Sequence, residues 1–379
     1  MTDLLYSETE DDLRAAVRSL LTDRADPSVV LGRIESGDPY VPGLWKSLAG
    51  DMGAAGLLVP EKLGGQGASH REAAVVLEEL GRAVTPAPYL TSAVVATETL
   101  LALDTESAPV AELLAGLAAG RTVAVLALPL STAPDAGPAT PAASPAPTGA
   151  GPTTPASGAT GARTVTGVAD AVIADIFLVP RADGLHAVQA ADAVVEPRTP
   201  LDLTRPLAAV TTGDATGVRL ADAEASAAAI RRGLLAGAGL LASEQLGLAE
   251  WCLEETVRHT RERYQFNRPV GSFQALKHRM AQLWLEVVNA RAAARAAADA
   301  LAIGSPDAPL TVAVVQAYCS KVAVHAAEEC VQLHGGIGMT WEHPAHLALK
   351  RAKSDQIALG SAGRHQDTIA ALVGLPAPV

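Results

Sequence analysis

The run Arg263–His278 places groups that can bind an anion beside a sharp turn. The guanidinium of Arg263 can hold a phosphate through paired, charge-assisted hydrogen bonds. Gln265 and Phe266 add an amide and an aromatic ring close by. A proline and a glycine then interrupt the helical pattern, and Ser272 is expected to cap a new helix. A surface turn between helices that carries an exposed arginine would read the same way, so these residues alone leave both interpretations open.

A second candidate is the glycine-rich segment Gln332–Thr340. Gly335, Gly336 and Gly338 follow a predicted helix, whereas a dinucleotide-binding glycine loop follows a strand and opens a helix. The segment is therefore not a Rossmann loop. It fits either the end of a helix or a place where the backbone closely approaches a ligand.

Other chemistries find little support in the residue spacing. Four histidines, His334, His343, His346 and His365, lack the spacing of a helical zinc motif, and no metal site is predicted. The Gly-Ser-Ala-Gly run at residues 360–363 lacks the pattern and the preceding strand of a nucleophile elbow.

Length, charge and cysteine content bound the class of protein. The chain has 379 residues, enough for two or three domains, and a formal net charge of −12. That charge argues against a nucleic-acid partner. Three cysteines without paired spacing indicate buried thiols in a reducing compartment.

The chain is expected in the cytoplasm, without a membrane span. Its first residues are acidic, unlike a signal peptide. The uncharged runs Gly233–Ser243 and Ala308–Ser320 are each too short to cross a bilayer.

Periodicity divides the chain into three regions. Residues 1–120 are predicted to form a helical domain, 121–222 a shortened β domain, and 223–379 a helical bundle. Within the middle region, residues 131–166 consist largely of Ala, Pro, Gly, Thr and Ser, which predicts a flexible loop. Strands are expected at 122–126, 171–179, 185–189, 193–195 and 208–210. A last helix is expected from Pro344 to about Val373. The predicted fold class is mainly α with a small β middle domain (α+β).

Four segments together resemble the acyl-CoA dehydrogenase family. Arg263–His278 is similar to its Arg-x-Gln-Phe-x-Arg-Pro-Val-Gly signature, and Gln332–Gly338 to its Gln-x-His-Gly-Gly-x-Gly segment. Gly56–Gly67 and Glu78–Ala83 are similar to phrases of its N-terminal domain. The resemblance covers both helical regions. It implies an N-terminal helical domain, a β-barrel that is reduced here, and a C-terminal four-helix bundle.

The same resemblance implies FAD as cofactor and α,β-desaturation of an acyl-CoA thioester as the activity. It also implies an electron-accepting flavoprotein and a homo- or hetero-tetramer with a homologous acyl-CoA dehydrogenase subunit. The Arg and the polar residue two positions on would hold the FAD pyrophosphate, with the Phe beside them, and the glycine segment would approach the adenosine half from the neighbouring subunit. These roles transfer to Arg263, Gln265, Phe266, Gln332, Gly335 and Gly336.

The sequence departs from the family where a catalytic base is needed. The usual Glu position is occupied by Leu359, which cannot accept a proton, and the alternative position falls near Gly237. Glu244 lies seven residues further along a similar helical face, where it could serve as a base or as a packing and salt-bridging residue. No catalytic residue is therefore assigned. The family's glycine-rich flavin loop and Trp-Ile-Thr phrase are also missing from the middle region.

This shortened form resembles one subunit of the actinobacterial heteromeric acyl-CoA dehydrogenases. The leading hypothesis is a subunit whose unlike partner supplies the base. The alternatives are a homomeric enzyme that uses a base such as Glu244, and a non-catalytic structural subunit that completes a partner's flavin site. The trimmed middle region suggests a bulky substrate, such as a ring-bearing or branched acyl-CoA.

Overall fold

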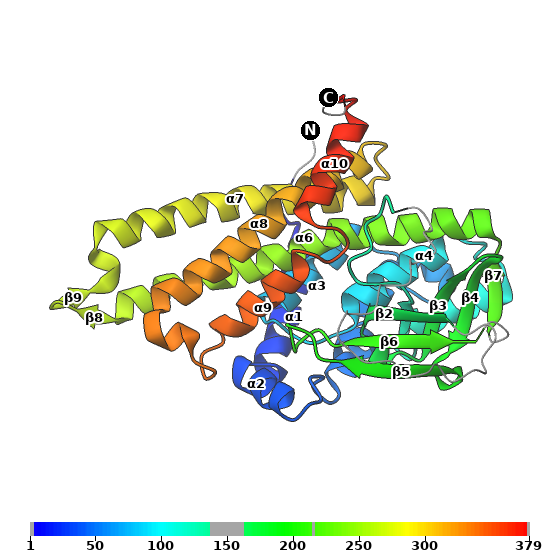
Figure 1. Ribbon diagram of the computed structural model, residues 1–379, viewed down its shortest axis with the longest axis horizontal. Helices are drawn as coiled ribbons and strands as arrows, with labels where there is room; N and C mark the ends of the chain where they lie inside the picture. The colour runs from blue at the N-terminus through cyan, green and yellow to red at the C-terminus, as the bar shows by residue number, and fades with distance from the viewer. Residues whose placement is uncertain (1–3, 137–162, 214–216, 377–379) are drawn as a thin grey trace, which may run out of the picture.

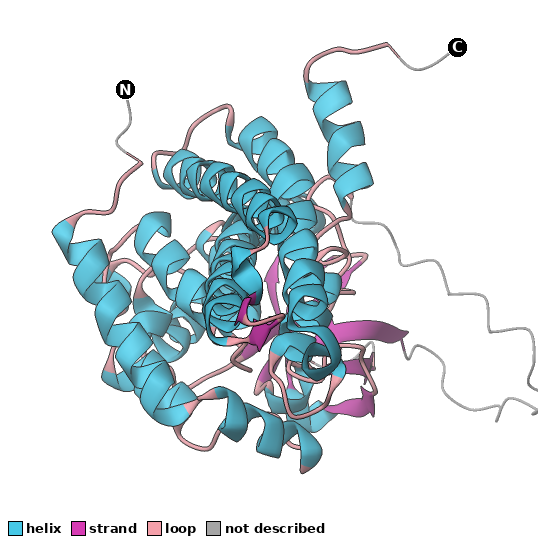
Figure 2. Ribbon diagram, turned by 90° about the vertical axis from the view of Figure 1, so that its left-hand side faces the viewer, coloured by secondary structure: helices cyan, strands magenta, loops and turns pink. Residues whose placement is uncertain are grey.

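The computed structural model describes residues 4–136, 163–213 and 217–376. Three long helices form an elongated bundle, and shorter helices and a β region pack along one half of it (Figure 1). Viewed along the bundle, the strands gather on one side of the helices (Figure 2). The predicted fold class, mainly α with a small β middle domain, is confirmed.

The N-terminal region consists of five α-helices joined by short 3₁₀ and π turns. Two of them begin with capping boxes, in which Ser7 pairs with Glu10 and Ser69 with Glu72, so the first-turn amides are satisfied. The helices are α1 (Glu8–Arg24), α2 (Pro27–Glu35), α3 (His70–Arg82), α4 (Thr97–Leu101) and α5 (Ala108–Ala118).

The middle region contains two small sheets that share a core of their own. One sheet has the strand order β1-β3-β4-β7 and the other β2-β6-β5. Val165, Val168, Phe177 and Val210 are buried between them. The strands are β1 (Ala124–Leu126), β2 (Arg163–Ala169), β3 (Ile176–Arg181), β4 (Gly184–Gln189), β5 (Ala193–Arg198), β6 (Leu207–Thr212) and β7 (Val218–Ala221).

Two strands are missing from the sequence prediction. β2 begins at Arg163, so the end of the predicted loop 131–166 is a strand, while residues 137–162 lie outside the described chain. Gly167 sits at φ 75° where the β2–β6 register shifts, and this irregularity hides the strand's alternation. β7 is also new, and the predicted strand 171–179 begins only at Ile176.

The C-terminal region is built on α6 (Ala223–Glu262), α7 (Gln274–Ala302) and α8 (Ala308–His334). The 40 residues of α6 make it about 60 Å long. Two glycines let α3 and α6 cross backbone to backbone. A Cβ on Gly81 would lie 2.1 Å from the carbonyl oxygen of Glu244, and one on Gly247 would lie 1.8 Å from that of Glu78.

The predicted last helix is two helices, α9 (Ala345–Asp355) and α10 (Ala362–Leu372). The break contains Leu359 at φ 53° and Gly360 at φ 106°, both left-handed, which a continuous helix excludes. The break positions Leu359, which occupies the place where the family resemblance expects a base.

Helix α8 is longer than the uncharged run 308–320 suggested. The stretch Ala308–Met339 is long and apolar enough to cross a membrane by length and composition alone. However, 61% of its most apolar window is buried inside the bundle, and a core helix passes the same test.

Candidate functional site

The turn after α6 is a two-residue β-hairpin formed by β8 (Tyr264–Gln265) and β9 (Arg268–Pro269). Phe266 and Asn267 occupy its tip at φ 53° and 58°, as a type I′ turn requires. The predicted cap at Ser272 is wrong. Helix α7 follows Phe273 without a side-chain cap, and the Ser272 hydroxyl is buried with no hydrogen-bond partner in the described chain.

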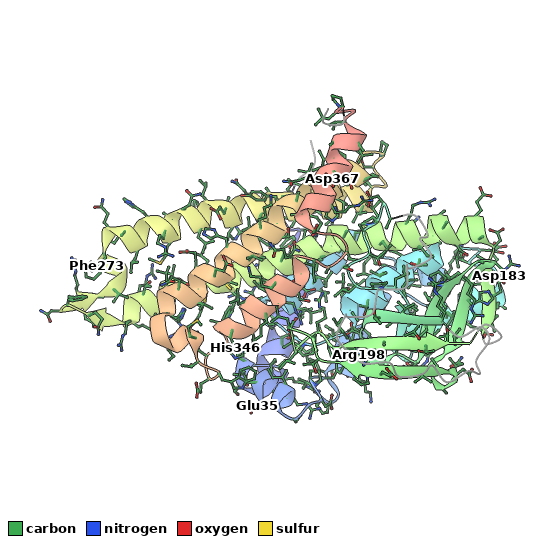
Figure 3. All side chains as sticks on the ribbon, viewed as in Figure 1. Glu35, Asp183, Arg198, Phe273, His346 and Asp367 are labelled. Carbon is green, nitrogen blue, oxygen red and sulfur yellow. The ribbon has the colours of Figure 1, made fainter. Side chains whose placement is uncertain are left out.

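The side chains of this hairpin are directed outward. Arg263 is exposed, and its guanidinium forms no hydrogen bond or ion pair with the described residues. Its backbone is fixed, because its N–H donates to the carbonyl of His259 at 2.9 Å and its carbonyl accepts from Val270 at 2.8 Å. Phe266 is 86% exposed, and its ring meets Phe273 edge-on at 6.0 Å between centroids. Phe273 marks this end of the bundle in Figure 3.

The glycine segment ends α8 at the same end of the molecule (Figure 1). Gly335 has φ 64° and ψ −138°, a conformation suited to glycine, and so stops the helix. Gln332, Gly335 and Gly336 are all exposed, and a Cβ on either glycine would meet nothing within 4 Å. The segment therefore stops a helix, as one interpretation predicts, and its exposed backbone is compatible with the other, which stays a prediction.

The hairpin and the glycine segment are neighbours because the ends of α6 and α8 pack together. The rings of His259 and His334 are in contact, with centroids 4.2 Å apart and planes inclined by 31°. A cation with no partner in the described chain, an exposed aromatic ring and bare glycine backbone fit a long anionic cofactor that approaches from outside this subunit. The six FAD-contact residues remain predictions.

Leu359 and Gly237, which occupy the two positions considered for a base, face each other. A Cβ on Gly237 would lie 3.1 Å from Cδ1 of Leu359 and 2.5 Å from Cγ2 of Val95. Leu359 is 3% exposed, and its N–H donates to the carbonyl of Leu130 at 2.7 Å.

The cavity beside Leu359 is apolar and narrow. Its volume is about 30 Å³, far below the roughly 300–1,000 Å³ of ordinary ligand pockets. Thr91 provides the polar side chain among the described lining residues, which are otherwise Leu, Val, Ala and Pro. A cavity of this size and composition offers neither a proton acceptor nor room for a thioester.

Glu244 is buried in a network of charged groups. It accepts hydrogen bonds from Arg205 and, at 2.5 Å, from Nη1 of Arg351. Arg351 also donates to Asp202 at 2.5 Å, while Arg205 lies 3.3 Å from Asp355. The network ties the loop before β6 to α6 and α9.

The electrostatics of this network identify Glu244 as a salt-bridging residue. Burial opposes its charge, but Arg205 and Arg351 outweigh burial and hold the pKa of Glu244 below its ordinary value. Burial, and then the charge of Glu244, raise the pKa of Asp355 to about 8. A carboxylate held by two arginines is a poor proton acceptor, so the network does not provide a base.

The structure also assembles a group that sequence spacing missed. Glu255 of α6, His334 of α8 and His343 of the following loop converge beside His259. Histidine spacing along the sequence gave no sign of it, because the residues come from three separate elements.

Comparison with known proteins agrees with this architecture. Residues 7–121 match the profile described as "Acyl-CoA dehydrogenase, N-terminal domain", and residues 227–374 match "Acyl-CoA dehydrogenase, C-terminal domain". Acyl-CoA dehydrogenase IpdE2 of Mycolicibacterium smegmatis is 34% identical over 93% of this chain and 95% of its own. Its Mycobacterium tuberculosis counterpart is 35% identical over 91% of each chain.

Solved structures show the same fold. A chain of the ChsE4-ChsE5 complex from Mycobacterium tuberculosis matches with a TM-score of 0.80 and 23% identity over all of both chains. A chain of the steroid ACAD Tcur3481-Tcur3483 matches with a TM-score of 0.80 and 25% identity, over 97% of this chain and 98% of that one. Both helical regions match family profiles, two relatives align along most of the chain, and the fold is shared with solved structures. This chain therefore belongs to the acyl-CoA dehydrogenase family.

Proposed function

We propose that this chain is one subunit of a heteromeric, FAD-dependent acyl-CoA dehydrogenase, in which it binds the cofactor and an unlike partner supplies the catalytic base. The observation that carries the proposal is the apolar packing of Leu359 against Gly237, beside a cavity of only about 30 Å³. Both positions expected for a base lack a carboxylate, and the space between them is filled.

The cofactor-binding role is assigned to the hairpin and the glycine segment. FAD, when bound, supplies the hydride acceptor of the reaction. The guanidinium of Arg263 would pair with the pyrophosphate, with the Gln265 amide next to it. Phe266 would cover the cofactor with its exposed ring. Holding Phe266 at a positive φ is unfavourable for an aromatic residue, and such strain is usually retained where a contact depends on it.

The partner is proposed to be a homologous chain with an intact base and an open acyl cavity. Similarity to chains from the ChsE4-ChsE5 complex and the Tcur3481-Tcur3483 steroid ACAD supports both an unlike partner and a ring-bearing acyl-CoA substrate. An electron-transferring flavoprotein would reoxidise the complex.

The test is expression of the chain alone, of a homologous acyl-CoA dehydrogenase encoded beside it alone, and of both together. Visible flavin absorbance and dye-linked oxidation of ring-bearing acyl-CoA are measured for each preparation. We expect a flavin spectrum and turnover from the co-purified complex and no turnover from this chain alone. Oxidation by this chain alone, at the rate of the complex, would contradict the proposal.

The small apolar cavity also favours a second candidate function, that of a structural subunit that binds no flavin itself. The Arg263→Ala complex separates the two, because its flavin content falls only if this chain contacts the cofactor. The homomeric enzyme with Glu244 as base is disfavoured, since that carboxylate already accepts from two buried arginines.

A further inference from the structure

We infer that Glu255, His334 and His343 form a binding site for a divalent transition-metal ion of the zinc class, placed where α6, α8 and the segment before α9 meet. One ligand atom from each residue lies within 4.8 Å of the other two. The three residues are not among the proposed flavin contacts, although His334 is adjacent to Gly335, and none of them lines the cavity at Leu359.

The orientation of His334 is that of a metal-binding histidine. Its Nδ1 lies 2.6 Å from the carbonyl oxygen of Cys330, which assigns the ring proton to Nδ1. A second hydrogen bond of this kind orients most metal-ligating imidazoles. In the neutral form of the ring the lone pair is then on Nε2, which is buried and has no hydrogen-bond partner among the described residues.

The distances around Nε2 suit a shared ion better than a hydrogen bond. Oε1 of Glu255 lies 3.6 Å from Nε2 of His334 and 3.6 Å from Nε2 of His343. Both separations exceed an ordinary charge-assisted hydrogen bond of about 2.8 Å. They are close to the ligand–ligand edge of about 3.3 Å that follows from tetrahedral zinc with bonds of 2.0–2.1 Å.

The ligand set specifies the class of ion. Two imidazole nitrogens and one carboxylate oxygen suit Zn²⁺ and its neighbours Co²⁺ and Ni²⁺, whereas Mg²⁺ and Ca²⁺ prefer oxygen donors. Arg258 donates to both oxygens of Glu255 and so fixes the carboxylate in place. His259 presents its ring face to His334 and is not counted as a ligand.

One contact must give way for the ion to bind. The backbone N–H of Ala345 donates to Nδ1 of His343 at 3.2 Å, which leaves that ring's proton on Nε2. For Nε2 to present a lone pair, the ring proton must move to Nδ1 and the contact with Ala345 must break, so binding would shift the segment between α8 and α9. That segment begins with Gly335 and Gly336, so an ion would fix the glycine backbone relative to α6.

The experiment uses the full chain without flavin, stripped with a chelator and then titrated calorimetrically with ZnCl₂. We expect one Zn²⁺ per chain and a higher Tm. Co²⁺ in its place should give the visible absorption of a tetrahedral nitrogen–oxygen site. Because no flavin is involved, the result is independent of whether the proposed function holds.

Two variants and one control define the site. His343→Asn and Glu255→Gln should each weaken Zn²⁺ binding at least about 10-fold, the smallest loss seen even for partners of metal ligands. His278→Asn, at an exposed histidine on α7, should bind like the parent. His343 lies in a loop, so circular dichroism should show that its variant folds. Failure of the parent to bind Zn²⁺, or equal binding by parent and His343→Asn, would overturn the inference.

Discussion

Helix α6 passes through two regions that differ in almost every physical respect. Around Gly237 it packs against Leu359 and Val95, which also line a small apolar cavity. At Arg263, 26 residues and about 39 Å further on, it ends in an exposed hairpin with a cation free of partners in the described chain. The outward-facing region presents a cation and an aromatic ring, whereas the internal region is packed with apolar side chains.

The two regions differ in what they contribute to the stability of this chain. The cavity at Leu359 is internal, so filling it adds buried apolar contact and stabilises this chain. The hairpin contributes nothing comparable to its own fold, because Phe266 is 86% exposed and lies at a left-handed φ. Its retention points to a contact outside the chain.

The largest expected effect comes from breaking the charged network between the two regions. Glu244→Gln should lower the free energy of unfolding by about 3 kcal/mol, the low end for loss of one partner of a buried ion pair. The low end is expected because Asp355 can ionise and partly replace the lost charge. Urea denaturation measures the change.

Glu254→Gln on the same helix is the matched control for this change. Glu254 pairs with Arg82 at the surface and is 59% exposed, so its loss should cost less than about 1 kcal/mol. Folded Glu244→Gln in the heteromeric complex should keep its turnover per flavin. Loss of turnover with flavin retained would instead make Glu244 a base.

Leu359→Ala directly tests the apolar packing around Leu359. The truncation should cost about 2–3 kcal/mol of unfolding free energy, because the cavity of about 30 Å³ would grow without collapsing. The chain alone should remain inactive, since space without a carboxylate supplies no base. Ile357→Ala, two residues away and 58% exposed, should change stability little. Equal losses in both variants would show that Leu359 does not fill a core position.

Arg263→Ala probes the exposed region. Loss of a charge-assisted hydrogen bond of about 1.5–3 kcal/mol should weaken FAD binding to the complex about 10- to 100-fold. The unfolding midpoint of the isolated chain should not move, because the side chain has no partner in the described structure. Arg261→Ala, at another exposed arginine near the end of α6, is the control for net charge. Unchanged flavin affinity would contradict the proposal that Arg263 pairs with the FAD pyrophosphate.

Sequence patterns predicted the long helices and the exposed turn because both depend on residues close together in the chain. The apolar stripe on α7 repeats at helical spacing, and the family signature is continuous. Strand β2 was not predicted, because a register shift around Gly167 breaks the alternation of its inward- and outward-facing side chains. Glu244 with Arg351, and Gly237 with Leu359, became partners only through the packing of distant elements, which periodicity cannot supply.

The smallest effect concerns pH and the protonation of Asp355. Burial, followed by the charge of Glu244, raises the pKa of Asp355 to about 8 in the folded chain, against an ordinary value near 4. Between these values the folded state keeps a proton that the unfolded state has lost, so stability falls as pH rises toward 8. The lowered pKa of Glu244 acts in the opposite direction, but only in acid, below its ordinary value.

Asp355→Asn removes this titration while preserving the size of the side chain. The difference in unfolding free energy, variant minus parent, should therefore increase from pH 6 to pH 8 and then level off. Urea denaturation at several pH values measures it, with Asp367→Asn as the control at an exposed carboxylate of α10 (Figure 3). Parallel pH profiles for Asp355→Asn and the parent would mean that Asp355 is ionised throughout. The network would then carry an additional negative charge beside Glu244. It would therefore stabilise the fold less than the apolar packing around Leu359 does.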